Sequence, residues 1–548
     1  MPTITIDRKV FEKLVGKKLP DEKLKDRISM LGTDLEEVNN KEITVEIFPN
    51  RPDMLSAQGF ARAFSSFIGV NKGLRKYNVK KSGYKVIMDK SLPKQWPYAF
   101  ACIVKGLKFD DEKIKEVIQI QEKLGMTMMR KRKKGGIGLY PLEKIKFPVK
   151  FVGMKPDEIK FRPLEYATSL TGNQILSKHP TGREYGHLVE GWDKYPIFID
   201  DNNRIMSMPP IINSHEIGKI DESTTEVFLE ITGNDANVLQ YGINIIVTAL
   251  ADMGGQIYSI ECVMQDGKKV VIPNLEPTEM KFDLDYCNKW LGLELNEDDV
   301  KKLLEQMGYG YNKKALVPAY RPDVIHQVDL FEDIAIAYGY ENFVPNIPNL
   351  STIGEEDKFE VFKKKIANIL IGLGLIELNT YNLSNKENQC SKMKTEIPLI
   401  EIDNAVNIDY NVMRAWVIPS LLETYASNRH HEYPQNIFNI GTVFKKGNSD
   451  TGIVNNERLA VGVCRENADY TKIKQVLDYL FRMLDVEYKI EEVEHDSFII
   501  GRVARVLVKG KKLAFIGEVN PEVLHNWDLV VPVSAFELNL TELYSLVK

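Results

Sequence analysis

The sequence predicts a multidomain protein of α+β or mixed α/β class, and three observations support this. The chain has 548 residues, more than a single hydrophobic core usually spans. Segments with helical periodicity alternate with segments that have the period-two pattern of strands. Polar or proline-rich stretches interrupt the pattern near residues 71–85 and 344–350. We therefore expect four domains, at residues 1–80, 81–275, 276–345 and 346–548.

Residues 1–80 are expected to form a small α/β domain. The segment 21–32 (DEKLKDRISMLG) has a helical pattern, and 41–50 (KEITVEIFPN) alternates as a strand does. A second helix is expected within residues 50–70, where apolar side chains recur at helical spacing. Ser56 lies near its start, where a hydroxyl can cap the first backbone N–H groups.

The domain expected at residues 81–275 contains the first candidate site. A hairpin is expected at residues 195–208, where two strand-like segments flank a turn. The following strand, VFLEIT, places Phe228, Glu230 and Thr232 on one face. These side chains could meet water. They could equally line a small pocket for an aromatic ring with a polar tip, where a buried acceptor pairs with a phenolic hydroxyl.

A run of five basic residues lies in the same domain, directly before a glycine-rich stretch. Such a run is often a solvated loop, yet beside flexible backbone it can also bind the phosphates of a nucleic acid. The net charge of the chain is only −5, so any nucleic-acid contact must be a local patch. The run consists of Arg130, Lys131, Arg132, Lys133 and Lys134.

Residues 276–345 are expected to form a helix-rich domain. Asn296 can cap a helix that ends near Gly308. A second helix is expected from Val328 to Tyr338, because apolar side chains recur there at helical spacing and Gly339 follows at a C-cap position.

Four carboxylates lie in this second helix or just before it. Positions three and four apart are neighbours on a helix, so like charges there repel unless a cation, a partner's basic groups or water screens them. The group could be a solvated acidic face. It could also bind a hard cation such as magnesium, which prefers oxygen ligands. The four residues are Asp323, Asp329, Glu332 and Asp333.

Residues 346–548 again mix helix and strand patterns, which predicts another α/β domain. A helical pattern covers 358–374 (KFEVFKKKIANILIGLG), and strand patterns cover 502–508 and 512–519.

The cysteine usage and the apolar segments indicate a cytoplasmic protein without membrane association. Five cysteines are widely spaced and form no CxxC pair, which favours a reducing compartment and argues against zinc. The N-terminal segment lacks the pattern of a signal peptide, and no run of eighteen apolar residues occurs.

Local motifs for nucleotide or nucleophile chemistry are absent from the sequence. No GxxxxGK[ST] loop and no GxSxG elbow occurs. None of the GxG patterns continues as a dinucleotide-binding fingerprint. The adjacent His430 and His431 would point apart on a helix or strand, so they cannot chelate one metal as an i, i+4 pair would.

Several longer motifs, in order along the chain, resemble the β subunit of phenylalanyl-tRNA synthetase in its archaeal and eukaryotic cytosolic form. The last third is similar to the catalytic-like domain of that subunit, through YNVMRAWVIPSLLETYASNRHHEYPQNIFNIG and FIGEVNPEVL. The other motifs are PNRPDMLSAQGFAR at 49–62, SMPPIINS at 207–214, EITGND at 230–235 and RPDVIHQVDLFEDIAIAYGY at 321–340.

The resemblance implies a heterotetramer of two α and two β chains. The α subunit would activate phenylalanine with ATP and charge tRNA. The last domain would have the antiparallel sheet of class II synthetases without the catalytic motifs, since Asn439 stands where that family commonly has glutamate. The ligase active site would then lie on the α subunit.

The resemblance also implies two sites on this chain. An editing site, which hydrolyses tRNA mischarged with tyrosine, would include Ser207, Lys219, Glu230 and Thr232, and the basic run at 130–134 would guide the tRNA end. A magnesium ion shared with the α subunit would be bound by the four acids around the second helix, Asp323, Asp329, Glu332 and Asp333.

Two other functions remain open at this point. The chain could be a scaffold subunit whose editing pocket has decayed, although Glu230 and Thr232 are present. It could also be a stand-alone nucleic-acid-binding protein built on residues 276–345, although its low overall basicity argues against this.

Overall fold

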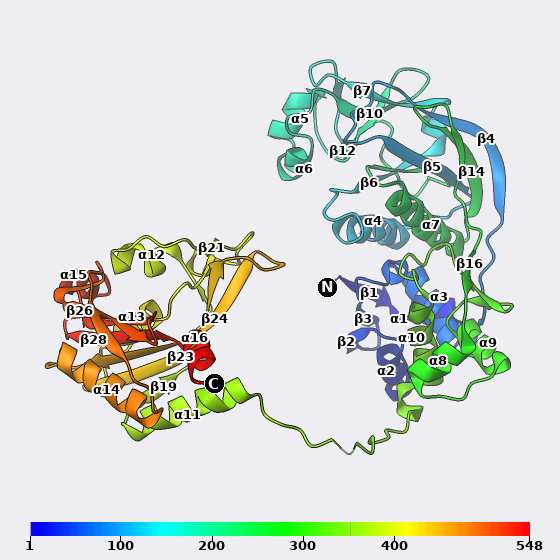
Figure 1. Ribbon diagram of the computed structural model, residues 1–548. Helices are drawn as coiled ribbons and strands as arrows, with labels where there is room; N and C mark the ends of the chain where they lie inside the picture. The colour runs from blue at the N-terminus through cyan, green and yellow to red at the C-terminus, as the bar shows by residue number, and fades with distance from the viewer. Residues whose placement is uncertain (1, 351) are drawn as a thin grey trace. The chain divides into compact units, whose positions relative to one another are not determined.

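The computed structural model describes residues 2–350 and 352–548. They form two compact units, the first ending at Ile347 and the second running from Pro348 to Lys548 (Figure 1). The finer division into four domains stays a prediction. Within the described ranges, no helix has both the length and the apolar character needed to cross a bilayer.

A three-stranded antiparallel sheet with strand order β1-β3-β2 begins the first unit. Helices α1 and α3 pack together through Phe11, Phe60 and Phe64, whose ring centroids lie 5.3 to 6.2 Å apart. Ser56 caps α3, as predicted, because its side chain accepts a hydrogen bond from the backbone N–H of Gly59. The elements are β1 (Thr3–Asp7), α1 (Arg8–Val15), α2 (Asp21–Met30), β2 (Asp34–Val38), β3 (Glu42–Glu46), the 3-10 helix η1 (Pro52–Met54) and α3 (Ala57–Phe67).

A ten-stranded sheet forms the middle of the first unit, with strand order β12-β11-β10-β7-β4-β14-β5-β13-β6 and β15 paired to β14. Strand β4 runs parallel to β14 and β7, and the other pairs are antiparallel. Helices α4 and α7 cover one face beside β5, β6 and β13 (Figure 1). The strands are β4 (Val79–Met88), β5 (Tyr98–Lys105), β6 (Gly135–Pro141), β7 (Val149–Met154), β10 (Tyr195–Ile199), β11 (Ile205–Met208), β12 (Ile212–Asn213), β13 (Glu226–Gly233), β14 (Gln256–Val263) and β15 (Lys269–Ile272).

Short helices and a two-stranded sheet surround the far edge of this large sheet. The predicted hairpin is confirmed, since β10 and β11 pair with Phe198 opposite Ser207. The remaining elements of the region are α4 (Asp111–Met126), η2 (Leu142–Lys144), β8 (Lys160–Phe161), β9 (Leu170–Thr171), α5 (Gly172–Lys178), α6 (Pro180–Tyr185), η3 (Gly186–Leu188) and α7 (Ala236–Asp252).

A small group of three helices and a three-stranded sheet, β16-β18-β17, completes the first unit. Asn296 caps α9, as predicted. Helix α10 begins at Gln327, one residue before the predicted start, because His326 is its N-cap, and it ends before Gly339 as expected. The elements are β16 (Thr278–Lys281), α8 (Leu284–Leu291), α9 (Glu297–Gln306), β17 (Gly310–Tyr311), β18 (Lys314–Val317), α10 (Gln327–Tyr338) and η4 (Tyr340–Asn342).

The second unit is built on a seven-stranded sheet with order β19-β23-β24-β28-β27-β26-β25. All pairs are antiparallel except β19 with β23. Helices α11, α14 and α16 share one hydrophobic cluster with the sheet, and α13 and α15 share another.

Three elements of the second unit were predicted from sequence patterns, and all three are present. The helical pattern at 358–374 corresponds to α11, and the two predicted strands lie within β26 and β27. The elements are α11 (Lys358–Gly372), β19 (Ile376–Leu378), β20 (Leu383–Ser384), α12 (Lys386–Gln389), η5 (Ser391–Met393), β21 (Ile400–Glu401), η6 (Ile408–Tyr410), β22 (Val412–Met413), α13 (Ile418–Ser427), β23 (Gln435–Lys446), β24 (Ile453–Cys464), α14 (Tyr470–Met483), β25 (Lys489–Glu492), β26 (Phe498–Val508), β27 (Lys511–Val519), α15 (Pro521–Asn526), β28 (Val533–Asn539) and α16 (Leu540–Val547).

Candidate functional site

Strand β13 lies between β5 and β6, and Phe228, Glu230 and Thr232 on one of its faces are buried. In its register with β6, Glu230 is opposite Gly138 and Thr232 is opposite Gly136. Directly opposite residues of an antiparallel pair share a face. The two glycines therefore leave space beside the carboxyl and the hydroxyl, where larger residues would fill it.

Tyr140 reaches Glu230 across this space. Its Oη lies 2.9 Å from Glu230 Oε1 and 3.2 Å from Asn213 Oδ1. A Cβ atom added at Gly138 would clash with both the Glu230 carboxyl and the Tyr140 hydroxyl. The contact between Tyr140 and Glu230 therefore requires a glycine at position 138.

The Glu230 carboxyl is held in an environment that favours its protonated form. Only 2% of the residue is exposed. Burial raises the pKa of Glu230 to about 8, and the hydrogen bond with Tyr140 acts in the opposite direction. Burial, and after it the charge of Glu230, raises the pKa of Tyr140 well above its ordinary value. Near neutral pH the phenol therefore keeps its hydrogen and much of the carboxyl carries a proton.

Three oxygen atoms in this region are buried and have no hydrogen-bond partner among the described residues. They are Glu230 Oε2, Thr232 Oγ1 and Ser207 Oγ, although the Ser207 hydroxyl lies near enough to Tyr140 to lower the pKa of the phenol. Ser207 on β11 lies opposite Asn213 on β12, and Asn213 contacts Tyr140, so the serine belongs to the same neighbourhood. A buried polar group without a partner costs about 1–3 kcal/mol, so such groups mark a place where a ligand can bind.

A cavity of about 330 Å³ opens beside Glu230. This volume is within the ~300–1,000 Å³ typical of small-molecule sites. Its walls combine apolar side chains with polar ones, among them Gln121, Glu122, Glu165 and Thr181, so they offer contacts to both an aromatic ring and polar groups. The walls include Ile118, Ile137, Leu164, Ile211, Asn213 and Arg132.

Of the four predicted editing residues, only Glu230 lines the cavity wall; Ser207 and Thr232 are buried behind it, and Lys219 differs from all three because it is at the surface. It is exposed on the segment after β12, and Lys144 donates a hydrogen bond to its backbone carbonyl at 3.3 Å. The structure therefore brings Ser207, Glu230 and Thr232 together and leaves Lys219 at the surface.

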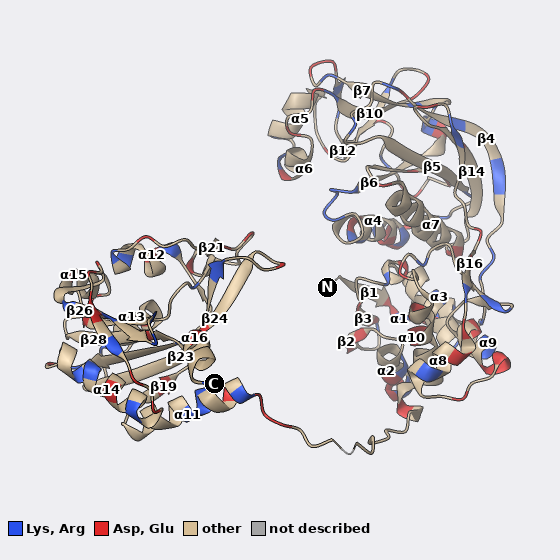
Figure 2. Ribbon diagram, in the orientation of Figure 1, with Lys and Arg blue, Asp and Glu red and all other residues tan. Residues whose placement is uncertain are grey.

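The basic run forms a tight turn directly after α4, where Figure 2 shows a blue loop. Arg130, Lys131 and Arg132 have φ angles of 50°, 53° and 61°, in the left-handed region that is costly for residues with a side chain. The backbone N–H of Arg132 donates to the Gly125 carbonyl at 3.0 Å and closes the turn.

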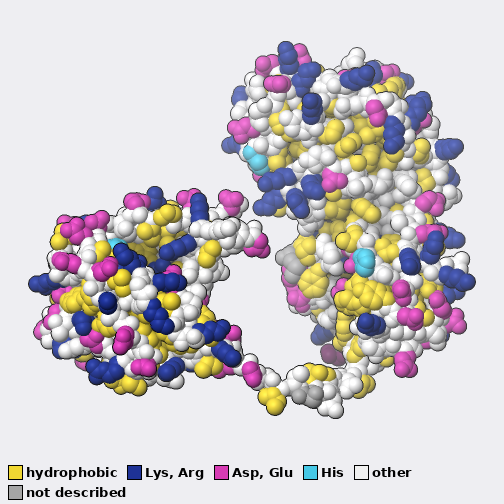
Figure 3. Space-filling model, in the orientation of Figure 1, with side chains coloured by type: hydrophobic (Ala, Val, Ile, Leu, Met, Phe, Trp, Pro, Cys, Tyr) yellow, Lys and Arg dark blue, Asp and Glu magenta, His cyan; other side chains and the backbone are white. Residues whose placement is uncertain are grey.

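The five basic side chains of this turn divide into two groups. Arg132 donates to the carbonyls of Pro210 and Ile211 in the cavity wall, and Lys134 pairs with Asp235 at 3.0 Å. The other three are exposed, and basic side chains gather at the corresponding place on the face shown in Figure 3. These three are Arg130, Lys131 and Lys133.

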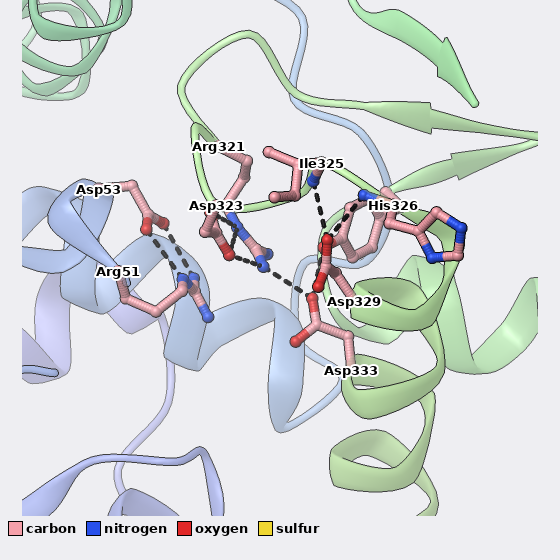
Figure 4. Close-up of polar contacts among 9 residues, drawn as sticks. Arg51, Asp53, Arg321, Asp323, Ile325, His326, Asp329 and Asp333 are labelled. Carbon is pink, nitrogen blue, oxygen red and sulfur yellow. Dashed lines mark hydrogen bonds and ion pairs between the residues drawn. The ribbon is translucent and has the colours of Figure 1, made fainter. Parts of the chain in front are cut away.

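The predicted magnesium ligands have a different environment, shown in Figure 4. Arg321 donates to Asp323 at 2.8 and 2.9 Å and to Asp333 at 2.8 Å. The side chain of Arg321 is 3% exposed, and the hydroxyl of Tyr309 also donates to Asp333. Burial alone would lower the pKa of Arg321, but Asp333, Tyr309 and Asp323 raise it well above its ordinary value. The guanidinium is therefore the resident cation of this cluster.

The other two acids do not join this cluster as free ligands. Asp329 caps its own helix, because its Oδ2 accepts hydrogen bonds of 2.8 Å from the backbone N–H groups of Ile325 and His326. Glu332 is exposed. The alternative of a solvated acidic face does not describe Asp333, which is buried against Arg321.

A second Arg-Pro-Asp segment faces this cluster. Arg51 donates to both oxygens of Asp53 at 2.9 Å, as Arg321 does to Asp323 (Figure 4). The charges of the two segments influence each other, because Arg321 lowers and Asp323 raises the pKa of Arg51. The sequence contained a signal for this pairing: the tripeptide RPD occurs at 51–53 and again at 321–323.

The four acids do not fit a magnesium ion in this arrangement. Two carboxylates are bound by Arg321 and a third by backbone N–H groups, which leaves Glu332 as the free one. Throughout residues 2–350 and 352–548, no three His, Cys, Asp or Glu side chains are grouped so that they could hold a metal.

In the sheet of the second unit, Asn439 stands at the position where the family commonly has glutamate. Asn439 on β23 is buried and donates to the Leu378 carbonyl at 2.9 Å and to Thr380 at 3.1 Å. It therefore stabilises the strand beside it.

Comparisons with known proteins identify the family. Residues 280–340 match the tRNA synthetase B5 domain, and residues 345–540 match the phenylalanyl tRNA synthetase beta chain CLM domain. The phenylalanine–tRNA ligase β subunit of Pyrococcus horikoshii is 40% identical over 99% of this chain and 100% of its own length. That of Methanococcus aeolicus is 37% identical over 98% of this chain and 100% of its own.

A solved structure gives the same result for the first part of the chain. It is an N-terminal fragment of the phenylalanyl-tRNA synthetase β subunit from Pyrococcus horikoshii, with 38% identity and a TM-score of 0.59. The match covers 62% of this chain and 99% of the fragment. The resemblance inferred from the motifs is thus confirmed, and the chain belongs to the family of phenylalanine–tRNA ligase β subunits, in its archaeal form.

Proposed function

We propose that this β subunit hydrolyses tRNA mischarged with tyrosine, at the cavity beside Glu230. The observation that carries the proposal is the set of three buried, unpaired oxygens on Ser207, Glu230 and Thr232. A pocket built for phenylalanine rejects the same ring with an added hydroxyl only about 100-fold. A second pocket that binds the hydroxyl supplies the missing selectivity.

Each of the three buried residues has a role that its position supports. Glu230 Oε2 accepts the phenolic hydroxyl of the tyrosyl group, since this oxygen is otherwise without a partner. The hydroxyls of Thr232 and Ser207 orient the ester or the attacking water. Lys219 is exposed, which suits a contact with a phosphate of the tRNA end better than a contact inside the cavity.

The basic turn after α4 is proposed to guide the tRNA end to this cavity. Arg130, Lys131 and Lys133 are exposed and available to phosphates. Arg132 and Lys134 have a structural part in the same proposal, because they hold the turn against the cavity wall and against Asp235.

The ligase reaction is proposed to take place on a separate α subunit, in a heterotetramer of two α and two β chains. The α subunit would bind ATP and phenylalanine. In this proposal the second unit of the β chain is a class II synthetase-like domain without catalytic residues, and the buried amide of Asn439 supports this. The five cysteines are buried and free, which is consistent with a cytoplasmic enzyme.

The expected magnesium ion is not supported by the geometry of Asp323, Asp329, Glu332 and Asp333. We propose instead that Arg321 provides the positive charge of this cluster. Its two charge-assisted contacts with Asp323 and Asp333 join the segment before α10 to the helix itself. The cluster then supports the fold of the first unit and takes no part in catalysis.

The editing proposal is tested with the complex of both subunits and two kinds of tRNA. Glu230→Ala and Thr232→Ala should leave phenylalanine charging intact and slow the hydrolysis of tyrosyl-tRNA by about tenfold or more. Glu226→Ala on the same strand is the control, because Glu226 is partly exposed and paired with Lys105. Hydrolysis at the parent rate in both pocket variants would show that the site is elsewhere.

A further inference from the structure

We infer that Tyr140 is a positioning residue that fixes the Glu230 carboxyl so that one defined oxygen, Oε2, is presented to the tyrosyl hydroxyl. The inference rests on the proposed editing function and adds a residue that determines its specificity. It starts from the contact between Tyr140 and Glu230 and from the two glycines that make this contact possible.

The sheet register sets up the contact. Tyr140 is opposite Phe228, and Glu230 is opposite Gly138, two positions away on the same face. The phenol must therefore cross over position 138 to reach the carboxyl, and only glycine leaves room for this. The ring of Tyr140 is fully buried, and its centroid lies 5.9 Å from that of Phe228. Packing thus fixes where the hydroxyl can be.

A protonated carboxyl at Glu230 is consistent with the hydrogen bonds at this contact. A phenolic oxygen carries one hydrogen, yet Tyr140 Oη lies within hydrogen-bond distance of two acceptors, Glu230 Oε1 and Asn213 Oδ1. Both contacts are satisfied when Glu230 is protonated on Oε1 and donates to Oη, while Oη donates to Asn213. Burial favours the protonated carboxyl, and the raised pKa of Glu230 agrees with this.

This arrangement gives the two carboxyl oxygens different roles. Oε1 carries the proton and is occupied by Tyr140. Oε2 is then a pure acceptor, buried and without a partner. A tyrosyl hydroxyl can donate to it, whereas a phenylalanyl ring leaves it unpaired. Glu230 Oε2 alone distinguishes the tyrosyl from the phenylalanyl ring. Tyr140 and Asn213 fix the direction in which this oxygen points.

The experiment uses the complex of both subunits with Tyr140→Phe, which keeps the ring and removes the hydroxyl. The control is Tyr195→Phe, since Tyr195 is buried in a different hydrophobic cluster of the same unit. Hydrolysis of tyrosyl-tRNA and of phenylalanyl-tRNA is measured for each protein. We expect the ratio of kcat/KM for the two substrates to fall about tenfold in Tyr140→Phe, mainly through KM for tyrosyl-tRNA, and to stay unchanged in Tyr195→Phe.

A binding measurement separates this inference from the proposed function. The probes are the amide-linked 3′-tyrosylamino and 3′-phenylalanylamino derivatives of adenosine, which imitate the charged tRNA end and resist hydrolysis. The parent should bind the tyrosyl probe more tightly, and Tyr140→Phe should remove that preference. If the parent shows the preference without hydrolysing tyrosyl-tRNA, the editing proposal fails and the positioning role stands. A Tyr140→Phe variant that keeps the parent's preference, or that loses only kcat and thermal stability, would overturn the positioning role.

Discussion

Two clusters of buried polar side chains lie in the first unit, and they differ in how completely their groups are paired. Around Arg321, the buried carboxylates and guanidinium groups contact each other, and none of their atoms is both buried and without a partner. Beside Glu230, three buried oxygens lack a partner. The cavity beside Glu230 has a volume of about 330 Å³, whereas the one lined by Arg51, Asp53 and Arg321 has only about 20 Å³.

The difference shows why a concentration of charge in the sequence is a poor guide to a binding site. Asp323, Asp329, Glu332 and Asp333 are conspicuous in the sequence, yet two of them are neutralised internally and one is a helix cap. Glu230 is a single carboxyl in an apolar strand. A buried group that the fold leaves unpaired is available to a ligand where a cavity also opens beside it, as it does at Glu230. Four measurements can break or sharpen this distinction.

The largest expected effect comes from removing the cation of the paired cluster. Arg321→Met leaves Asp323 and Asp333 buried without their common partner, and removing one member of a buried ion pair costs about 3–5 kcal/mol. Chemical denaturation of the full chain measures the loss in the free energy of unfolding. Lys314→Met is the control, because its pair with Glu279 is exposed and worth at most about 1 kcal/mol. Equal losses in the two variants would mean that the Arg321 cluster is not a structural core.

The second effect concerns the pH dependence of stability at the unpaired cluster. The pKa of Glu230 is raised to about 8 from an ordinary value of 4.5, so the folded chain retains a proton that the unfolded chain releases. This contribution to stability is complete below pH 4.5 and is lost as the pH rises toward 8, by at most about 1.4 kcal/mol per pH unit.

Glu230→Gln removes this titrating group, so the stability of the variant should fall less steeply than that of the parent between these pH values. Denaturation midpoints across the range measure the difference. Glu226→Gln on the same strand should follow the parent, since Glu226 is partly exposed and paired with Lys105. Parallel pH profiles for parent and Glu230→Gln would contradict the protonated carboxyl.

Local sequence patterns predicted the elements that depend on near neighbours. The capped starts of α3 and α9, the end of α10 at Gly339 and the hairpin of β10 and β11 are all confirmed. Each depends on residues that are close in the sequence, where spacing and capping chemistry act directly. The shared face of Phe228, Glu230 and Thr232 follows from strand alternation in the same way.

The side chains that contact these elements could not be predicted from the sequence, because these contacts depend on the pairing of segments that are far apart in the chain. Tyr140 and Gly138 meet Glu230 only through the register of β6 with β13, about ninety residues apart. The resemblance assigned Lys219 to the editing site, and its exposed position could not be read from the sequence. The pairing of Arg321 with Asp333 was missed because the arginine precedes α10, where the helical pattern does not reach.

A smaller effect is expected from two neighbouring acids of α10. Asp333→Asn weakens the contacts with Arg321 and Tyr309 and should cost about 1–3 kcal/mol of unfolding free energy. Glu332→Gln is the matched control one residue away, and as an exposed side chain it should change stability by less than about 0.5 kcal/mol. The opposite ranking of the two variants would mean that Glu332, not Asp333, is the acid that stabilises the fold.

The smallest effect is expected from adding magnesium. A lack of stabilisation in the parent is informative only when a variant that can bind magnesium is measured beside it. A ligand that binds only the folded state raises the free energy of unfolding, by about 2.7 kcal/mol when its concentration is a hundred times its Kd. In the parent, the guanidinium of Arg321 already contacts Asp323 and Asp333, so a magnesium titration should leave the unfolding midpoint unchanged. In Arg321→Met, the same two carboxylates face each other without a cation, and magnesium should restore part of the lost stability. Sodium chloride at matched ionic strength controls for screening. If magnesium stabilised the parent but not Arg321→Met, the conclusion that Arg321 takes the place of a metal ion would be wrong. Such a result would mean that the metal site needs the arginine.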